Sequence, residues 1–139
     1  MRHLRLRRCG LVVVLLASLL VLAATLYGAV RIGGHAFSVN NQLVRDHQYM
    51  GGCPVDLKFD WGVVGTHPTT ITYSITRSDG RQSSRAIRHP GGNRSIPIVE
   101  HWRLGANNPR FGNYRGWMQI DIQSPDPASN RIDFTLHCR

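Results

Sequence analysis

The segment CPVDLKFDW, residues 53–61, decides the fold of this chain. Apolar side chains occupy every second position from Cys53 to Trp61, and proline, lysine and two aspartates fill the positions between them. A period of two is that of a β-strand with one face in a core and the other in solvent. The segment therefore predicts a half-buried strand.

Two further segments alternate in the same way. In residues 70–76 the apolar side chains are Ile71, Tyr73 and Ile75, with threonine and serine between them. In residues 131–138 the apolar positions are Ile132, Phe134, Leu136 and Cys138. Each pattern predicts another half-buried strand.

Weaker signals connect these segments. Arg77-Ser78-Asp79-Gly80 predicts a turn, and residues 81–88 predict a polar edge strand that ends at His89-Pro90-Gly91-Gly92. Residues 96–104 predict a strand whose apolar parity is interrupted by Glu100, and Pro97 disfavours a central position for it. The next strand has two alternative inward faces, Trp117 on one parity or Met118, Ile120 and Ile122 on the other. Residues 37–43 offer a first strand.

These six or seven short strands, separated by turn signals and without an amphipathic helix, predict an all-β fold, an antiparallel β-sandwich. The chain has 139 residues, which favours a single domain. We place that domain at residues 37–139.

Residues 1–36 predict a targeting segment that precedes the domain. A leader containing Arg2, Arg5, Arg7 and Arg8 is followed by residues 11–30, which carry no charge. Two interpretations remain open: a cleaved signal peptide, with Ala23 or Ala36 before the cleaved bond, or a retained transmembrane helix, which the length of the run favours. Either interpretation exports the domain, by the positive-inside rule. Residues 31–34 are then a short linker.

The formal charge of the chain is +9. Without the four leader arginines and Arg31, 12 basic and 8 acidic residues remain, which leaves the exported part at +4. This modest excess, in an exported protein, argues against nucleic acid as a partner.

The cysteines agree with export. Cys9 lies in the leader, whereas Cys53 and Cys138 lie in the domain, each on the inward parity of its strand. In an oxidising compartment such a pair predicts a disulfide, the alternative being two buried thiols.

Several of these strings together resemble a group of bacterial exported immunoglobulin-like domains. The resemblance covers residues 53–138 and is carried by CPV, by TYSITRSDG, by HWRLG and by GWMQIDIQSPDPASNRIDFTLHC. It implies an immunoglobulin-like sandwich, paired terminal cysteines and an extracytoplasmic location, but no defined activity. The chain departs from the pattern in its longer segment 105–115 and in Arg103, which makes that strand end more basic.

No arrangement in the sequence predicts catalysis. The histidines are dispersed, without the spacing of a metal site, so we expect solvated histidines, no metal and no cofactor. There is no GxSxG serine motif, and Asp56 and Asp60 flank Lys58 on a solvent face.

The best candidate for binding is a tract of arginines and aromatic residues. Eight arginines lie between Arg77 and Arg115, opposed only by Asp79 and Glu100. Guanidinium groups bind carboxylate, sulfate and phosphate in pairs of hydrogen bonds, whereas charges on a weak strand also protect a sheet edge from aggregation. The residues predicted to form a binding surface at the loop 105–115 are Arg103, Arg110, Phe111, Tyr114 and Arg115.

The sequence thus favours a non-enzymatic binding or structural module of the cell envelope. Its expected partners are the membrane, through the N-terminal segment, and an envelope protein or an anionic glycan or lipid. The alternative is an envelope-anchored enzyme or inhibitor.

Overall fold

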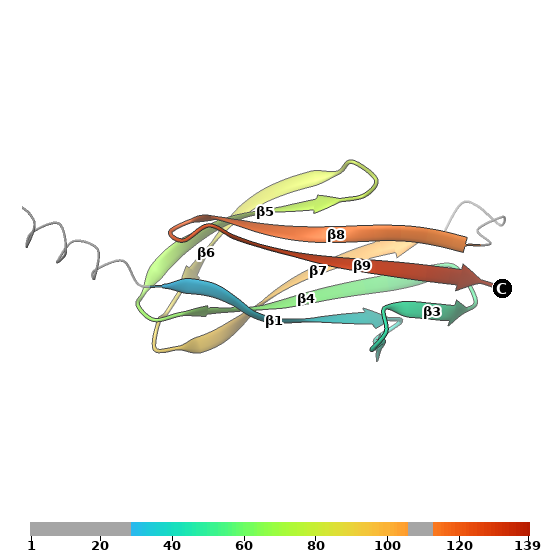
Figure 1. The fold of residues 1–139 in the computed structure, drawn as a ribbon, viewed down its shortest axis with the longest axis horizontal. Helices are drawn as coiled ribbons and strands as arrows, with labels where there is room; N and C mark the ends of the chain where they lie inside the picture. The colour runs from blue at the N-terminus through green and yellow to red at the C-terminus, as the bar shows by residue number, and fades with distance from the viewer. Residues whose placement is uncertain (1–28, 106–112) are drawn as a thin grey trace, which may run out of the picture.

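A computed structural model describes residues 29–105 and 113–139. These residues form two sheets, with strand orders β2-β1-β4-β7 and β3-β9-β8-β5-β6 (Figure 1). All strand pairs are antiparallel except β3 with β9. The strands are β1 (Val30–Val39), β2 (Gln42–Leu43), β3 (Gln48–Gly51), β4 (Val55–Gly65), β5 (Thr69–Arg77), β6 (Gln82–His89), β7 (Arg94–Leu104), β8 (Asn113–Ser124) and β9 (Ala128–Cys138).

The predicted β-sandwich is confirmed at the level of two packed sheets. The described residues contain no helix, and within those ranges no segment has the length and apolar character of a membrane-crossing helix. Of the predicted signal peptide or anchor, residues 1–36, the first 28 lie outside the described residues, and residues 30–36 belong to β1.

The core follows the alternation of the sequence. In β4 the side chains of Val55, Leu57, Phe59, Trp61 and Val63 are all buried, because every second residue faces the other sheet. The same holds for Ile71, Tyr73 and Ile75 of β5 and for Ile132, Phe134 and Leu136 of β9. In β8 the inward face is Met118, Ile120 and Ile122, which resolves the alternative left open by the sequence.

The first strand is longer than predicted. The expected linker, residues 31–34, belongs to β1, which begins at Val30 and pairs with the end of β4 at Gly65. The register shifts between Ile32 and Gly34, so a bulge moves the inward face from even to odd positions. This change of parity hid the strand, because no single alternation runs through it.

The chain also has two short strands that the sequence analysis missed, β2 and β3. β3 pairs in parallel with the end of β9, where Gly51 lies opposite Cys138. The predicted disulfide between Cys53 and Cys138 is confirmed, with Cα atoms 5.5 Å apart. It joins the end of β9 to the segment that crosses from β3 to β4.

The sandwich is elongated, and the start of β1 and the C-terminus lie at opposite ends of its long axis (Figure 1). The end where β1 begins also holds the β8–β9 turn, whose Asp126 carboxylate accepts a hydrogen bond of 2.8 Å from the Val30 backbone N–H. The disulfide lies at the other end, with Gly105 against Cys53.

Candidate functional site

Six of the eight arginines of the tract, from Arg77 to Arg103, lie along one side of the sandwich. β6 is the last strand of the five-stranded sheet and β7 is the last strand of the four-stranded sheet, as predicted for both. The two strands are joined by the turn at residues 90–93. We call residues 77–104, which comprise these two strands, the β5–β6 turn and the β6–β7 turn, the β6–β7 edge.

This edge holds the whole net charge of the described residues. Residues 77–104 contain six arginines and two carboxylates, a net charge of +4. The other described residues contain six basic and six acidic side chains, which cancel. A one-sided charge of this kind creates a potential that attracts anions to one face of a protein.

The β5–β6 turn is built by Arg77-Ser78-Asp79-Gly80. The Asp79 carboxylate accepts hydrogen bonds from the Arg77 guanidinium at 2.8 and 3.2 Å and from the Arg81 backbone N–H at 3.1 Å. Ser78 Oγ accepts one from the Trp117 N–H at 3.1 Å, which docks the turn on β8. Gly80 has a φ of 85°, which costs glycine little. Every residue of this motif therefore has a role in the turn itself.

Asp79 is held in its ionised form. Partial burial acts to raise the pKa of Asp79, but the Arg81 N–H and the hydrogen bonds and charge of Arg77 outweigh it, as does the charge of Arg81. The pKa of Asp79 therefore lies below its ordinary value. The turn keeps a fixed negative charge between two guanidinium groups.

Arg77 also joins the two sheets. Its guanidinium carbon lies 4.7 Å from the centre of the Trp102 ring, on β7, in a cation–π contact. Its side chain is only 16% exposed. The carboxylate of Asp79 and the ring of Trp102 thus fix this guanidinium from two sides.

An ion pair bridges the two edge strands, β6 and β7. Arg85 Nη1 of β6 lies 2.5 Å from Glu100 Oε1 of β7. The Glu100 side chain is 15% exposed, and its Oε1 is buried without a well-aligned hydrogen bond. This contact explains why Glu100 interrupts the apolar parity of β7. At this side of the sandwich an apolar side chain at position 100 would be partly exposed to solvent, and the ion pair takes its place.

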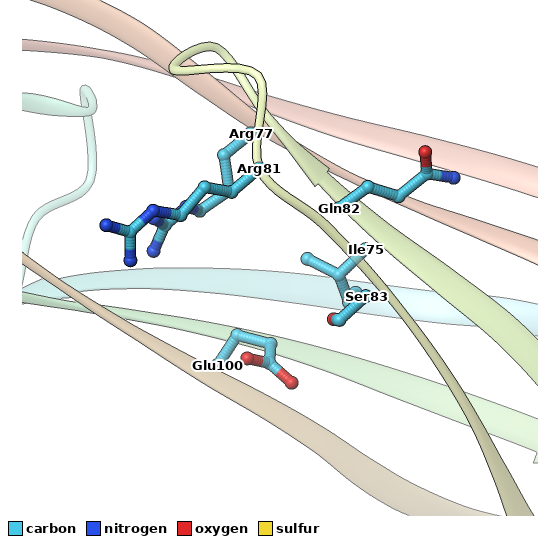
Figure 2. A pocket seen from close by; sticks show the side chains of 6 residues that line it. All are labelled: Ile75, Arg77, Arg81, Gln82, Ser83 and Glu100. Atoms are coloured by element: carbon cyan, nitrogen blue, oxygen red, sulfur yellow. The ribbon is translucent and has the colours of Figure 1, made fainter.

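Between these groups lies a hollow of about 170 Å³. Figure 2 shows Arg77 and Arg81 reaching in the same direction from the β5–β6 turn, with Glu100 across the gap on β7. Ile75 and Ser83 also line the hollow. Its volume is below the 300–1,000 Å³ that is usual for small-molecule sites, so it suits a single side chain or a small anion.

Three arginines of the edge remain without an acidic partner. Among the described residues no carboxylate lies within 4.0 Å of Arg88, Arg94 or Arg103, and all three are exposed. Arg88 ends β6 and Arg94 begins β7, so both flank the turn at residues 90–93. These side chains are available to an external anion.

His89 is a residue whose environment the sequence analysis misjudged. It was expected in solvent but is fully buried. Its Nε2 lies 3.0 Å from the Arg94 carbonyl oxygen and 3.3 Å from that of Val63, and its Nδ1 accepts from the Gly91 N–H at 2.9 Å. The ring thus holds the β6–β7 turn together, and its position before Pro-Gly-Gly was the one available signal.

Of the five predicted loop residues, the structure describes Arg103, Tyr114 and Arg115. Arg103 of β7 and Arg115 of β8 are exposed at outward positions of different sheets. Arg115 lines a hollow with Asp46, His47 and Asp133. Arg110 and Phe111 lie outside the described residues.

Tyr114, predicted to form part of the binding surface, is half-buried. Its ring packs against Trp102 and Phe134 with centroids 6.1 and 5.9 Å apart, and its hydroxyl lies 3.3 Å from Ser78 Oγ. Tyr114 therefore belongs to the packing of the sandwich end.

The described ranges contain no group of three or more histidine, cysteine, aspartate or glutamate side chains arranged to hold a metal ion. No family model matches the chain, and neither a curated protein nor a solved structure was found to be similar to it.

Proposed function

We propose that this protein is a non-enzymatic binding module of the cell envelope, displayed outside the cytoplasmic membrane, which contacts an anionic partner through the β6–β7 edge. The observation that carries the proposal is the charge distribution. The edge has a net charge of +4, whereas the rest of the described domain is neutral.

The extracytoplasmic location is supported by two independent features. The disulfide between Cys53 and Cys138 is typical of oxidising compartments. The basic leader and uncharged run of residues 1–30 are typical of an export signal or membrane anchor.

An immunoglobulin-like topology is supported by the strand order. The orders β1-β4-β7 and β9-β8-β5 correspond to strands A-B-E and G-F-C of that fold. The disulfide departs from the antibody pattern, in which strands B and F are linked, because Cys53 precedes β4 and Cys138 ends β9. Binding modules are a frequent use of such sandwiches, but the fold alone carries no function.

The position of the arginines separates those that build the fold from those that remain for a ligand. Arg77 is held by Asp79 and Trp102, and Arg85 is paired with Glu100. Arg88 and Arg94 are exposed and lack a carboxylate neighbour in the described structure. We therefore assign the contact with the anion chiefly to Arg88 and Arg94, assisted by Arg81.

The test is retention of the full-length chain, in detergent, on immobilised dextran sulfate, a polyanion without sequence. An Arg88→Glu, Arg94→Glu variant should elute at clearly lower salt than the wild type, because exposed charges act within a Debye length of about 8–10 Å. The matched control is Arg45→Glu, Arg139→Glu, which makes the same change of charge at exposed residues away from the edge. Equal losses in both variants would contradict a localised site.

A further inference from the structure

We propose that the partner is an acidic peptide segment in extended conformation, which adds to the five-stranded sheet as a strand beside β6. This inference rests on the proposed function and names the class of its ligand. It is carried by the backbone of β6, by the charge beside it and by the hollow at its start.

The register of β5 with β6 shows which backbone groups are free. The Arg77 N–H donates to the Arg81 carbonyl at 2.9 Å, and the same register continues through Thr76 with Gln82 to Thr69 with His89. Since hydrogen-bonded and non-hydrogen-bonded pairs alternate, the odd residues of β6 direct their backbone groups to β5. The even residues direct theirs to the free side: Gln82, Ser84, Ala86 and Arg88.

β6 is the free strand best suited to receive another strand. It has eight residues and no proline. β7, the free strand of the other sheet, contains Pro97, which has no N–H to donate. The strands at the opposite side, β2 and β3, have two and four residues. An extended peptide that pairs with such an edge gains main-chain hydrogen bonds, as in β-augmentation.

The charge beside β6 selects an acidic partner. Arg81, Arg85 and Arg88 lie on or directly before this strand, and Arg94 follows across the turn. A second copy of the chain is disfavoured, because pairing β6 with β6 would bring arginines of both copies together, and like charges on paired strands destabilise. An acidic segment on the same edge would instead place carboxylates beside these arginines, and the opposite charges would attract.

The hollow can accommodate one side chain of such a peptide, at the start of β6. It opens at the start of β6, between Arg81, Ser83 and Glu100, with the fixed guanidinium of Arg77 in its wall. Its volume of about 170 Å³ accommodates one carboxylate side chain rather than a cofactor. The Arg81 guanidinium suits that group, because the Arg81 side chain is 80% exposed whereas Arg77 is held by Asp79 and Trp102.

The first experiment measures binding of labelled peptides to the full-length chain by fluorescence anisotropy. The probe is a peptide of about ten alternating glutamates and threonines, and the control has lysine in place of glutamate. A third peptide is the acidic one with N-methyl groups on its four central residues, which blocks both of its edges. We expect the acidic peptide to bind, the methylated one to bind about tenfold or more weakly, and the basic one not to bind.

A variant of the protein tests the same contact from the other side. Ser84→Pro removes an N–H that faces the free edge without removing a bond to β5, and should weaken the peptide while leaving the melting temperature nearly unchanged. Ser84→Ala removes only the side chain and should bind like the wild type. If Ser84→Pro unfolds the chain, the methylated peptide still decides the question.

The outcomes separate this inference from the proposed function. Equal binding of the methylated and unmethylated peptides would show that charge alone attracts them, and would overturn strand addition. Binding of anionic phospholipid vesicles or dextran sulfate without binding of the peptide would overturn the peptide as partner. In both cases the anion-binding edge would stand; binding of none of these probes at low salt would overturn both.

Discussion

The two pairs of edge strands, β2 with β3 and β6 with β7, are protected from edge-to-edge association in different ways. At the β2–β3 side, residues 42–51, the strands are short, the charges of Arg45 and Asp46 cancel, and a disulfide joins the adjoining segment to β9. At the β6–β7 side the strands are long, no covalent link is present, and arginines surround an ion pair and a hollow. Short edges and inward charges are both known means of preventing edge-to-edge association. The comparison shows two different means of protection. The β2–β3 side relies on short strands and a disulfide, whereas the β6–β7 side leaves long edge strands accessible and relies on charge.

The largest expected effect concerns the β2–β3 side. Replacing Cys53 and Cys138 by serine should lower the free energy of unfolding by about 2–5 kcal/mol, because the unfolded chain regains the freedom of a long loop. Chemical denaturation of the oxidised protein and of the variant measures this difference. A change below about 1 kcal/mol would mean that the covalent link does not maintain this side of the fold.

The next largest effect on the free energy of unfolding is expected at the β6–β7 turn. His89→Ala should cost about 2–4 kcal/mol, because it leaves a cavity and removes the partners of the Gly91 N–H and the Arg94 carbonyl. The control is His67→Ala, at an exposed position, where a change within about 0.5 kcal/mol is expected. Thermal unfolding of both variants makes the comparison; equal stability would show that the buried imidazole is dispensable.

Cys138 and His89 illustrate what the sequence could and could not predict. Cys138 shares the inward parity of its strand, so its pairing with Cys53 followed from alternation and compartment. His89 ends a polar strand in which Ile87 is the one apolar residue of its parity. Its burial depends on carbonyl groups of Val63 and Arg94, which only the fold brings together.

The candidate site was predictable only in part. The arginine tract and its edge strand were visible as composition and weak periodicity. The roles of its members were not, because Arg77 is fixed by Trp102 and Arg85 by Glu100, across two sheets. The start of β1 was missed for a local reason, the bulge that reverses its parity after Ile32.

A smaller effect on stability, with a larger one on association, is expected at the ion pair. An Arg85→Leu, Glu100→Leu variant should change the free energy of unfolding by about 1 kcal/mol or less, since replacing a partly buried pair by apolar groups is often neutral. It should self-associate more, because the free strands lose their inward charges. Sedimentation velocity measures this. Lys58→Leu, Asp60→Leu removes an ion pair from the central strand β4 and is the control for added surface hydrophobicity.

The smallest effect is that of Asp79. Because its folded pKa is lowered, its ionised form stabilises the fold above the ordinary aspartate pKa, near 4, and this contribution is lost as the pH falls through the folded value. Asp79→Asn should therefore be less stable by about 0.5–1 kcal/mol at pH 7. The difference from the wild type should shrink as the pH falls through the folded pKa of Asp79. A difference that stays constant on acidification would show that the carboxylate charge is not what supports the turn.

The most direct test of the central claim, that the β6–β7 edge is the anion-binding surface, is an arginine footprint of the unmodified protein. The full-length chain is treated with phenylglyoxal with and without dextran sulfate, and the extent of modification of each arginine is read by mass spectrometry. We predict that the polyanion protects Arg88 and Arg94 strongly, and that it leaves Arg45 and Arg139 as reactive as before. Protection spread evenly over all four arginines, or found at Arg45 and Arg139 alone, would contradict the account.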